Sequence, residues 1–113
     1  RLKEVFRERI QAFREACYQL FGYRVDMASE ASSRGAGTGA ATSFVLRPAK
    51  ADSKDDHLVF RFTQAGGMEI QETPFTAQPS RQQEVQTFIA KFRSIPAFTA
   101  NLTMELFQKQ TQC

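Results

Sequence analysis

Residues 1–23, RLKEVFRERIQAFREACYQLFGY, form the stretch around which the rest of the chain is organised. At about 100° per residue, its apolar side chains fall within one arc roughly 160° wide. The arc contains Leu2, Val5, Phe6, Ile10, Phe13, Ala16, Cys17, Leu20 and Phe21. The pattern predicts one amphipathic helix over residues 1–22. Because it begins without a capping residue or an initiator Met, we expect it to be the end of a longer helix.

Part of this arc has the spacing of a coiled-coil seam. Seven-residue steps relate Phe6, Phe13 and Leu20. The second seam position would hold Leu2, Arg9 and Ala16. An Arg at a seam position suits a helix that separates from its partner helix and packs against its own domain instead. We therefore expect a coiled-coil stem that forms a parallel homodimer near Leu2 and covers a sheet near Leu20.

The polar side of the same helix is sorted by charge. Basic residues border the apolar arc, whereas the opposite side holds Glu4, Glu8 and Glu15. One interpretation is a solvated face with weak Glu–Arg pairs, each worth roughly 0.2–0.5 kcal/mol. The other is a docking strip for an acidic or phosphorylated partner, formed by Lys3, Arg7 and Arg14. Basic groups beside an exposed apolar residue supply both charge-assisted hydrogen bonds and an anchor.

The composition is typical of one ordinary domain. The chain has 113 residues, a net charge of +3, eleven Phe and no Trp. So mild a charge does not indicate a nucleic-acid partner, which usually requires a concentrated basic patch. The two cysteines, Cys17 and Cys113, match neither a disulfide framework nor a metal site, so we expect a reducing compartment. No apolar run has the length of a signal or membrane segment, which predicts a cytosolic or nuclear protein without membrane insertion.

Alternating apolar and polar residues predict four strands after Gly22, which should end the helix with a positive φ. The strands are expected over residues 23–27, 42–47, 57–63 and 68–73. The Gly-rich residues 29–41 are predicted to be a flexible loop. In the third strand, Leu58, Phe60 and Phe62 should face inward. Short turns between the strands imply an antiparallel meander.

Two helices are predicted after Pro74. The first has Ser80 as N-cap and Gln83 at capping-box spacing, and its buried stripe contains Val85, Phe88, Ile89 and Phe92. The second begins near Pro96 and carries Ala97, Phe98, Leu102, Leu106 and Phe107. The order predicts an α+β fold with an antiparallel sheet covered on one face by helices. Residues 1–22 would end the stem and residues 23–113 would form the head, as one folding unit.

No residue pattern indicates catalysis. The single His, His57, begins a strand and has no Cys or Ser motif that would make it a catalytic base. The acidic pair Asp55 and Asp56 lies in a polar turn, where solvation explains it. The Gly-rich loop lacks the Lys and Ser or Thr of a phosphate-binding loop. We therefore expect no enzyme, no cofactor and no metal.

Both ends of the chain resemble a known family. Arg1-Leu2-Lys3 followed by EVFRERIQAFREACYQLFGYRVD, together with SIPAFTANLTMELFQKQT at residues 94–111, is similar to the C-terminal domain of the spindle-checkpoint protein mitotic arrest deficient one. The resemblance implies a homodimer in which a coiled-coil stem ends in a head like the RWD fold of kinetochore proteins. It also implies a non-enzymatic scaffold of the spindle assembly checkpoint, found in the nucleus and at the nuclear envelope in interphase and at unattached kinetochores in mitosis.

The same resemblance assigns partners and site residues. It implies that Arg1, Leu2 and Lys3 dock a phosphorylated segment of the checkpoint kinase budding uninhibited by benzimidazoles one. Arg1 would donate to phosphate, Leu2 would be the apolar anchor, and Lys3 would be a point charge. The family's upstream region carries the HORMA-domain protein mitotic arrest deficient two, and its head helps to assemble the mitotic checkpoint inhibitor. Thr111, in the tail, resembles a phosphorylation site of the kinase monopolar spindle one that binds the coactivator of the anaphase-promoting complex.

Two other classes of function remain open on the sequence. A generic kinetochore or coiled-coil dimerisation module would use the same apolar helix without a phosphate site. A nucleic-acid module is the third class, although the Gly-flanked aromatic signature of an RNA-binding sheet is missing. The two binding classes can be separated by experiment. A peptide-docking domain should have affinity for one phosphorylated peptide, whereas the affinity of a nucleic-acid module should fall evenly with salt.

Overall fold

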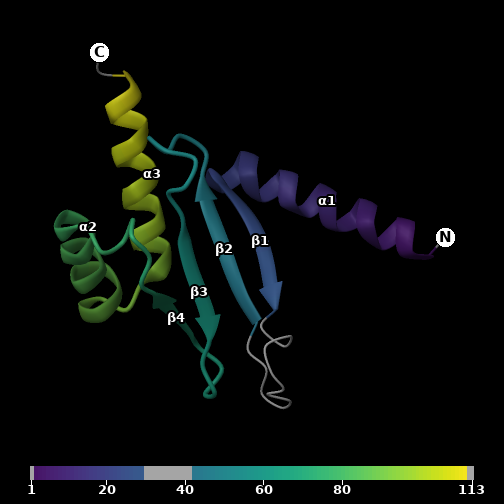
Figure 1. The fold of residues 1–113 in the computed structure, drawn as a ribbon, viewed down its shortest axis with the longest axis horizontal. Helices are drawn as coiled ribbons and strands as arrows, with labels where there is room; N and C mark the ends of the chain where they lie inside the picture. Colours follow the sequence, from purple (N-terminus) through teal and green to yellow (C-terminus); the bar gives the residue numbers. More distant parts are fainter. Residues whose placement is uncertain (1, 30–41, 112–113) are drawn as a thin grey trace.

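The computed structural model describes residues 2–29 and 42–111, so the predicted Gly-rich loop lies almost wholly outside the described residues. The described elements, in chain order, are α1 (Leu2–Phe21), β1 (Tyr23–Ser29), β2 (Thr42–Pro48), β3 (Leu58–Phe62), β4 (Met68–Gln71), α2 (Pro79–Glu84), η1 (Val85–Lys91) and α3 (Ile95–Thr111). Figure 1 shows α1 extending away from the sheet on one side, with α2 and α3 on the other. The predicted α+β class is confirmed.

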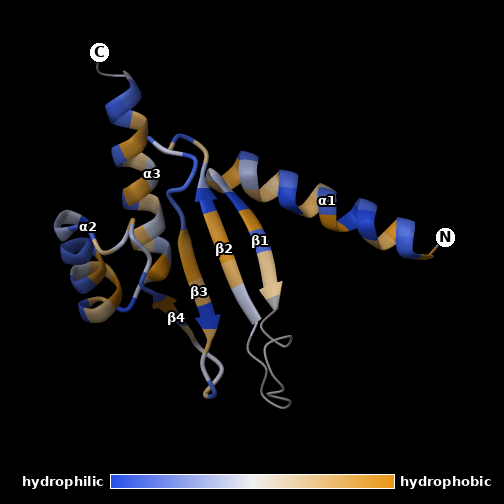
Figure 2. Ribbon diagram, in the orientation of Figure 1, coloured by the Kyte–Doolittle hydropathy of each residue, from blue (hydrophilic) through white to orange (hydrophobic). Residues whose placement is uncertain are grey.

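The four strands form one antiparallel sheet in the order β1-β2-β3-β4, which confirms the predicted meander. In the register, Tyr23 lies opposite Pro48, Phe44 opposite Phe60, and Phe60 opposite Ile70. Because side chains alternate along a strand, these residues share one face of the sheet. Figure 2 shows hydrophobic residues, in orange, along much of β2 and β3. The strand bounds differ from the prediction by two residues or fewer.

The core lies between that face of the sheet and α3. It contains Tyr23, Leu58, Phe60, Phe75, Phe98, Leu102 and Leu106. The inward orientation predicted for Leu58 and Phe60 is confirmed. Phe62 lies on the same face, opposite Met68, but it is not part of the core, because this side chain at the end of β3 is 51% exposed. Phe62 is the last residue of β3, and its ring packs edge-on against Phe44 at 5.5 Å between centroids.

Gly22 joins α1 to β1 and has a φ of +82°, as the sequence predicts for a helix-ending glycine. Its N–H donates to the Tyr18 carbonyl at 3.0 Å, and its own carbonyl accepts from the Ala49 N–H at 2.9 Å. These bonds connect the end of the helix to the turn after β2. The direction of α1 is therefore set at the edge of the sheet.

The start of the next helix differs from the prediction. Helix α2 begins at Pro79, and the capping position is held by Gln78 without a side-chain hydrogen bond. Proline favours the first helical position because its fixed φ suits a helix, so Ser80 lies inside the first turn and is not the N-cap. At α3 the predicted role of Pro96 is confirmed. There Ser94 Oγ accepts from the Ala97 N–H at 3.0 Å.

The predicted helix after Pro74 divides into α2 and the π-helix η1. Val85, Phe88 and Ile89 pack against the core as predicted, but Phe92 is 62% exposed. The Phe92 N–H donates to the Thr87 carbonyl at 3.1 Å, which is a five-residue step. A π-helical turn contains more residues than an α-helical turn. Phe92 is therefore rotated away from the stripe that α-helical spacing predicts.

Candidate docking site on helix α1

The apolar side chains of α1 lie on the surface of the protein. Leu2, Phe13 and Leu20 are 68%, 69% and 73% exposed, and no described residue of α1 is buried. In Figure 2 the apolar positions follow the helix along its whole length. The sequence predicted that the end near Leu20 covers the sheet, and this is wrong. Twenty residues of helix extend roughly 30 Å, so α1 offers a long apolar surface to a partner.

Polar residues attach α1 to the sheet. Arg14 Nε donates to the Val25 carbonyl at 2.9 Å, and its guanidinium forms an ion pair with Asp26. The guanidinium of Arg24 lies over the Tyr18 ring at 5.1 Å from the centroid. The Arg24 and Asp26 side chains alternate to the face of the sheet opposite the core. Because Arg14, on the border of the apolar arc, contacts β1, the arc itself is not the side of α1 that packs against the sheet.

The apolar surface continues from α1 onto α3. A hollow of about 410 Å³ is lined in part by Leu20, Phe21, Pro96, Ala100 and Met104. A neighbouring hollow of about 270 Å³ is lined in part by Pro48, Ala49, Met104, Leu106 and Phe107. Exposed apolar surface of this extent is typical of an interaction site. The end of α1 and the outer side of α3 therefore belong to the same candidate docking region.

The predicted site residues occupy two separate places. Arg1 lies outside the described residues, whereas Leu2 and Lys3 are exposed in the first turn of α1. Thr111 is the last residue of α3, so the expected tail is helical at this position. The Thr111 hydroxyl donates to the carbonyls of Phe107 and Gln108, each at 3.2 Å. Figure 1 places the first turn of α1 and the last turn of α3 at opposite sides of the molecule, so the structure does not bring these residues together.

A charged cluster that the sequence analysis did not find joins α2 to α3. Arg81 is only 8% exposed and donates to Glu84 at 2.9 Å and to Glu105 at 2.5 Å. Its guanidinium lies over the Phe75 ring at 5.0 Å. Burial raises the pKa of Glu84, whereas hydrogen bonds from its neighbours lower the pKa of Glu105. The sequence signal was an Arg three residues before a Glu, which is common on solvated helices.

The single histidine and the acidic residues beside it lie between β2 and β3. His57 Nδ1 lies 2.7 Å from the Asp55 carbonyl oxygen, a local turn contact. Within residues 2–29 and 42–111, no group of His, Cys, Asp and Glu has the arrangement of a metal site. Every helix in that part of the chain is too short or too polar to cross a membrane.

An α+β head carrying a long helix with an exposed apolar face has the form of a docking or assembly domain. The comparison with known families agrees with this class. The family described as mitotic checkpoint protein, MAD, matches residues 1–111. The chain belongs to this family, as the resemblance at both ends of the sequence indicated.

Individual relatives lie in plants, animals and fungi. The chain is 40% identical over 111 residues to "Mitotic spindle checkpoint protein MAD1" of Arabidopsis thaliana, covering 98% of this chain and 15% of that protein. It is 39% identical over 113 residues to "Mitotic spindle assembly checkpoint protein MAD1" of Homo sapiens, covering 98% and 14%. The "Spindle assembly checkpoint component mad1" of Schizosaccharomyces pombe is 29% identical over 110 residues, with 96% and 14% covered. The chain thus spans about one seventh of the length of these relatives.

Proposed function

We propose that this chain is the kinetochore-targeting head of a non-enzymatic spindle assembly checkpoint scaffold. In this proposal residues 1–22 end a coiled-coil stem, and residues 23–113 form an RWD-like head in one folding unit with it. The observation that carries the proposal is the apolar face of α1, which is exposed from Leu2 to Phe21 while Arg14, on its border, contacts β1. Such a face requires a partner, and membership of the mitotic checkpoint family indicates which class of partner to test.

The first partner of α1 is a second copy of the chain. Phe6 and Phe13 are 60% and 69% exposed, and they have the seven-residue spacing of a seam. Burying one Phe side chain contributes about 1.5–3 kcal/mol, so even a short seam gains substantially from pairing. A parallel pair keeps both heads at one end, next to the apolar hollows beside Leu20. The exposure, the spacing and the position of the hollows support this proposed homodimer.

The second partner is a phosphorylated segment of a checkpoint kinase, the kinase budding uninhibited by benzimidazoles one. It docks where Arg1, Leu2 and Lys3 begin the helix, with Arg1 on the phosphate, Leu2 as anchor and Lys3 beside acidic residues. Among the described residues, neither Lys3 nor Arg7 forms an ion pair, whereas Arg14 is engaged by Asp26. The basic border is thus available towards the start of α1 and occupied towards its end.

The wider role that we propose follows the family. The region upstream of Arg1 binds the HORMA-domain protein mitotic arrest deficient two, and the head helps to assemble the mitotic checkpoint inhibitor. Phosphorylated Thr111 binds the coactivator of the anaphase-promoting complex. The protein occupies the nucleus and nuclear envelope in interphase and unattached kinetochores in mitosis. This role uses neither nucleic-acid binding nor insertion into a membrane.

A generic dimerisation module is the second candidate. The observation that favours it is the extent of the apolar surface on α1 and α3, which would serve a homodimer without any phosphate site. Under this function, the charged border of α1 only keeps the helix soluble and attached to β1.

Calorimetric titration of one kinase-derived peptide, phosphorylated and unphosphorylated, distinguishes the two candidates. We expect the phosphorylated form to bind at least about tenfold tighter, because bonds to charged groups contribute about 1.5–3 kcal/mol each. Arg1→Ala should remove most of this difference, whereas Leu2→Ala should weaken both forms alike. Glu8→Gln, on the back of the same helix, is the matched control and should change neither. Equal affinity of the two peptide forms for the wild type would leave the dimerisation module as the function.

A further inference from the structure

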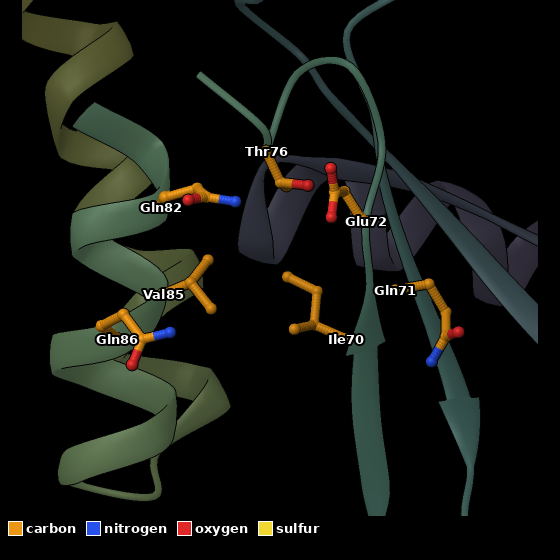
Figure 3. Close-up of a pocket in the computed structure, with 7 residues that line it drawn as sticks. All are labelled: Ile70, Gln71, Glu72, Thr76, Gln82, Val85 and Gln86. Atoms are coloured by element: carbon orange, nitrogen blue, oxygen red, sulfur yellow. The ribbon is translucent and has the colours of Figure 1, made fainter. Parts of the chain in front are cut away.

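A groove on the far side of the head from α1 lies between the edge strand β4 and the α2–η1 helix. Its volume is about 170 Å³. Figure 3 shows Ile70 of β4 and Val85 of η1 facing each other across it, with Glu72 and Thr76 at one end. A cavity of about 150 Å³ can hold a group the size of benzene. The groove is therefore large enough for one aliphatic side chain.

One wall of the groove is an open strand edge. In the turn between β3 and β4, the Thr63 N–H donates to the Gly67 carbonyl at 2.8 Å. Because hydrogen-bonded and non-hydrogen-bonded pairs alternate in an antiparallel ladder, the backbone N–H and C=O groups of Met68 and Ile70 point away from β3. In the part of the chain that the structure describes, no turn, loop or side-chain hydrogen bond reaches these groups. Such an edge is a template for another extended chain.

The side chains around the groove favour a peptide of particular chemistry. Gln82 and Gln86 are exposed on the helical wall, and amide groups both donate to and accept from peptide bonds. The Glu72 carboxylate lies at the end of the groove, and no ion pair among the described residues neutralises it. A cation placed two residues from the aliphatic side chain would reach this carboxylate, because Ile70 and Glu72 are two residues apart along the strand.

The helical wall itself is unusual. Val85 and Gln86 begin the π-helix η1, and π-helical turns occur frequently at functional sites. The first residues of this π-helix thus form part of the wall that faces the open edge of β4.

We propose that this groove binds an extended peptide segment, which adds as a fifth strand beside β4 and carries an aliphatic residue flanked at two residues by Lys or Arg. The aliphatic side chain enters between Ile70 and Val85, and the cation pairs with Glu72. The peptide backbone forms hydrogen bonds with the backbone N–H and C=O groups of Ile70. Gln82 and Gln86, on the helical wall, contact the side of the peptide that faces away from β4. This is recognition by strand addition, in which main-chain bonds give affinity and alternate side chains give specificity.

The probe is a synthetic peptide, acetyl-Thr-Lys-Thr-Val-Thr-Lys-Thr-amide, which places Lys two residues from Val in either chain direction. Titrated into the isotopically labelled 113-residue chain, it should shift the backbone amide NMR signals of β4 and η1 and leave those of α1 in place. The matched peptide with Glu for both Lys should bind about two- to fivefold more weakly, as expected for one exposed charge pair.

Charge exchange and backbone methylation then test the geometry. Glu72→Lys should reverse the preference between the Lys and Glu peptides. Glu69→Lys is the matched control, because Glu69 is on the same strand but alternates to the opposite face, where it pairs with Arg61 at 3.3 Å. N-methylation of the peptide Val blocks pairing with β4 in one chain direction, and N-methylation of the Thr that follows it blocks pairing in the other direction. Only one of these two peptides should therefore lose binding.

Several results would overturn the proposal. Signals shifted mainly in α1, equal affinity for the Lys and Glu peptides, or unchanged binding of both methylated peptides would each exclude strand addition at β4. Shifts of the β4 signals with protein concentration alone would identify a second copy of the chain as the occupant. The proposed docking site on α1 is independent of these outcomes, since Arg1→Ala alters no residue of the groove.

Discussion

Arg14 of α1 donates its Nε proton to the main-chain carbonyl of Val25, 2.9 Å away in β1. The same guanidinium pairs with the neighbouring Asp26. A main-chain acceptor and a carboxylate together fix both the position and the orientation of this side chain. Because Arg14 lies on the border of the apolar arc, its attachment to β1 turns the arc outwards. The exposure of Phe13 is a direct consequence.

Replacement of Arg14 should loosen the end of α1. We expect Arg14→Ala to lower the free energy of unfolding by about 1 kcal/mol, since the pair is one-third exposed and partly screened by solvent. Arg7→Ala, one border position earlier and without an ion pair among the described residues, should stay within about 0.5 kcal/mol of the wild type. Urea unfolding measures both values, and equal losses would show that Arg14 does not attach the helix.

The core of β3 can be tested with two rings on the same strand. Phe60 is 2% exposed and Phe62 is 51% exposed. Phe60→Ala should cost about 3–5 kcal/mol, enough to unfold a marginal domain. Phe62→Ala should cost about 1 kcal/mol, because about half of its ring is already in water. Thermal melts of both variants make the comparison, and a similar loss in each would contradict the difference in burial between the two rings.

Local sequence pattern determined most of the fold. Gly22 as helix end, the alternation around Phe60 and the Pro at the start of α3 each depend on neighbouring residues alone. These features occur in the structure as predicted. The bounds of the strands were accurate to about two residues, because turns and prolines mark them.

The errors arose where one part of the chain meets another. Helical periodicity identified the apolar face of α1, but it carries no information on whether that face meets the sheet or solvent; the pairing of Arg14 with Asp26 decides this. Phe92 was misplaced because the periodicity assumed 100° per residue, whereas η1 has a wider turn. The groove between Ile70 and Val85 joins an edge strand to a helix fifteen residues later, and no motif signals it.

The Tyr23 hydroxyl should make stability depend on pH in the alkaline range. Burial raises the pKa of Tyr23 from 10.0 to about 12, and the hydroxyl donates to the Thr99 carbonyl at 2.7 Å. A raised folded-state pKa stabilises the fold below pH 10, and this contribution is lost as the pH rises from 10 towards 12. Between about pH 9 and about pH 11, unfolding should become easier by about 1 kcal/mol.

Tyr23→Phe isolates this contribution. The variant should lose about 0.5–1.5 kcal/mol at neutral pH, because one hydrogen bond is removed while the Thr103 hydroxyl still donates to the Thr99 carbonyl at 2.8 Å. Its stability should then fall less between about pH 9 and about pH 11 than that of the wild type. Urea unfolding at both pH values gives the difference, and parallel pH profiles would show that the Tyr23 pKa is not raised.

The dimer proposed for α1 predicts a mass change. Sedimentation should give twice the chain mass, and Phe13→Glu should give the mass of one chain. The head should remain folded in that variant, since Phe13 is 69% exposed and contributes little to the core. Gln11→Glu adds the same charge on the back of α1 and should leave the dimer intact. The decisive test uses a wild-type chain extended upstream of Arg1, because the brief seam of the 113-residue chain can dissociate by itself. If the extended chain stays monomeric at micromolar concentration, the parallel dimer is excluded.

Phosphorylation of Thr111 should have a local effect on the fold and a larger effect on binding. The Thr111 hydroxyl donates to two carbonyls of the last turn of α3, and a phosphate ester has no hydroxyl proton to donate there. A charge of about −1.5 to −2 is also unfavourable at the negative end of a helix. We expect the last turn to open while Leu106, the last buried residue of α3, keeps its packing. Amide exchange should therefore accelerate after Phe107 and stay slow before it.

The opened, charged turn is the proposed handle for the coactivator of the anaphase-promoting complex. Titration of the coactivator should therefore show binding to the phosphorylated chain and none to Thr111→Val. Equal coactivator binding by both, or exchange unchanged by phosphorylation, would remove Thr111 as a regulatory site.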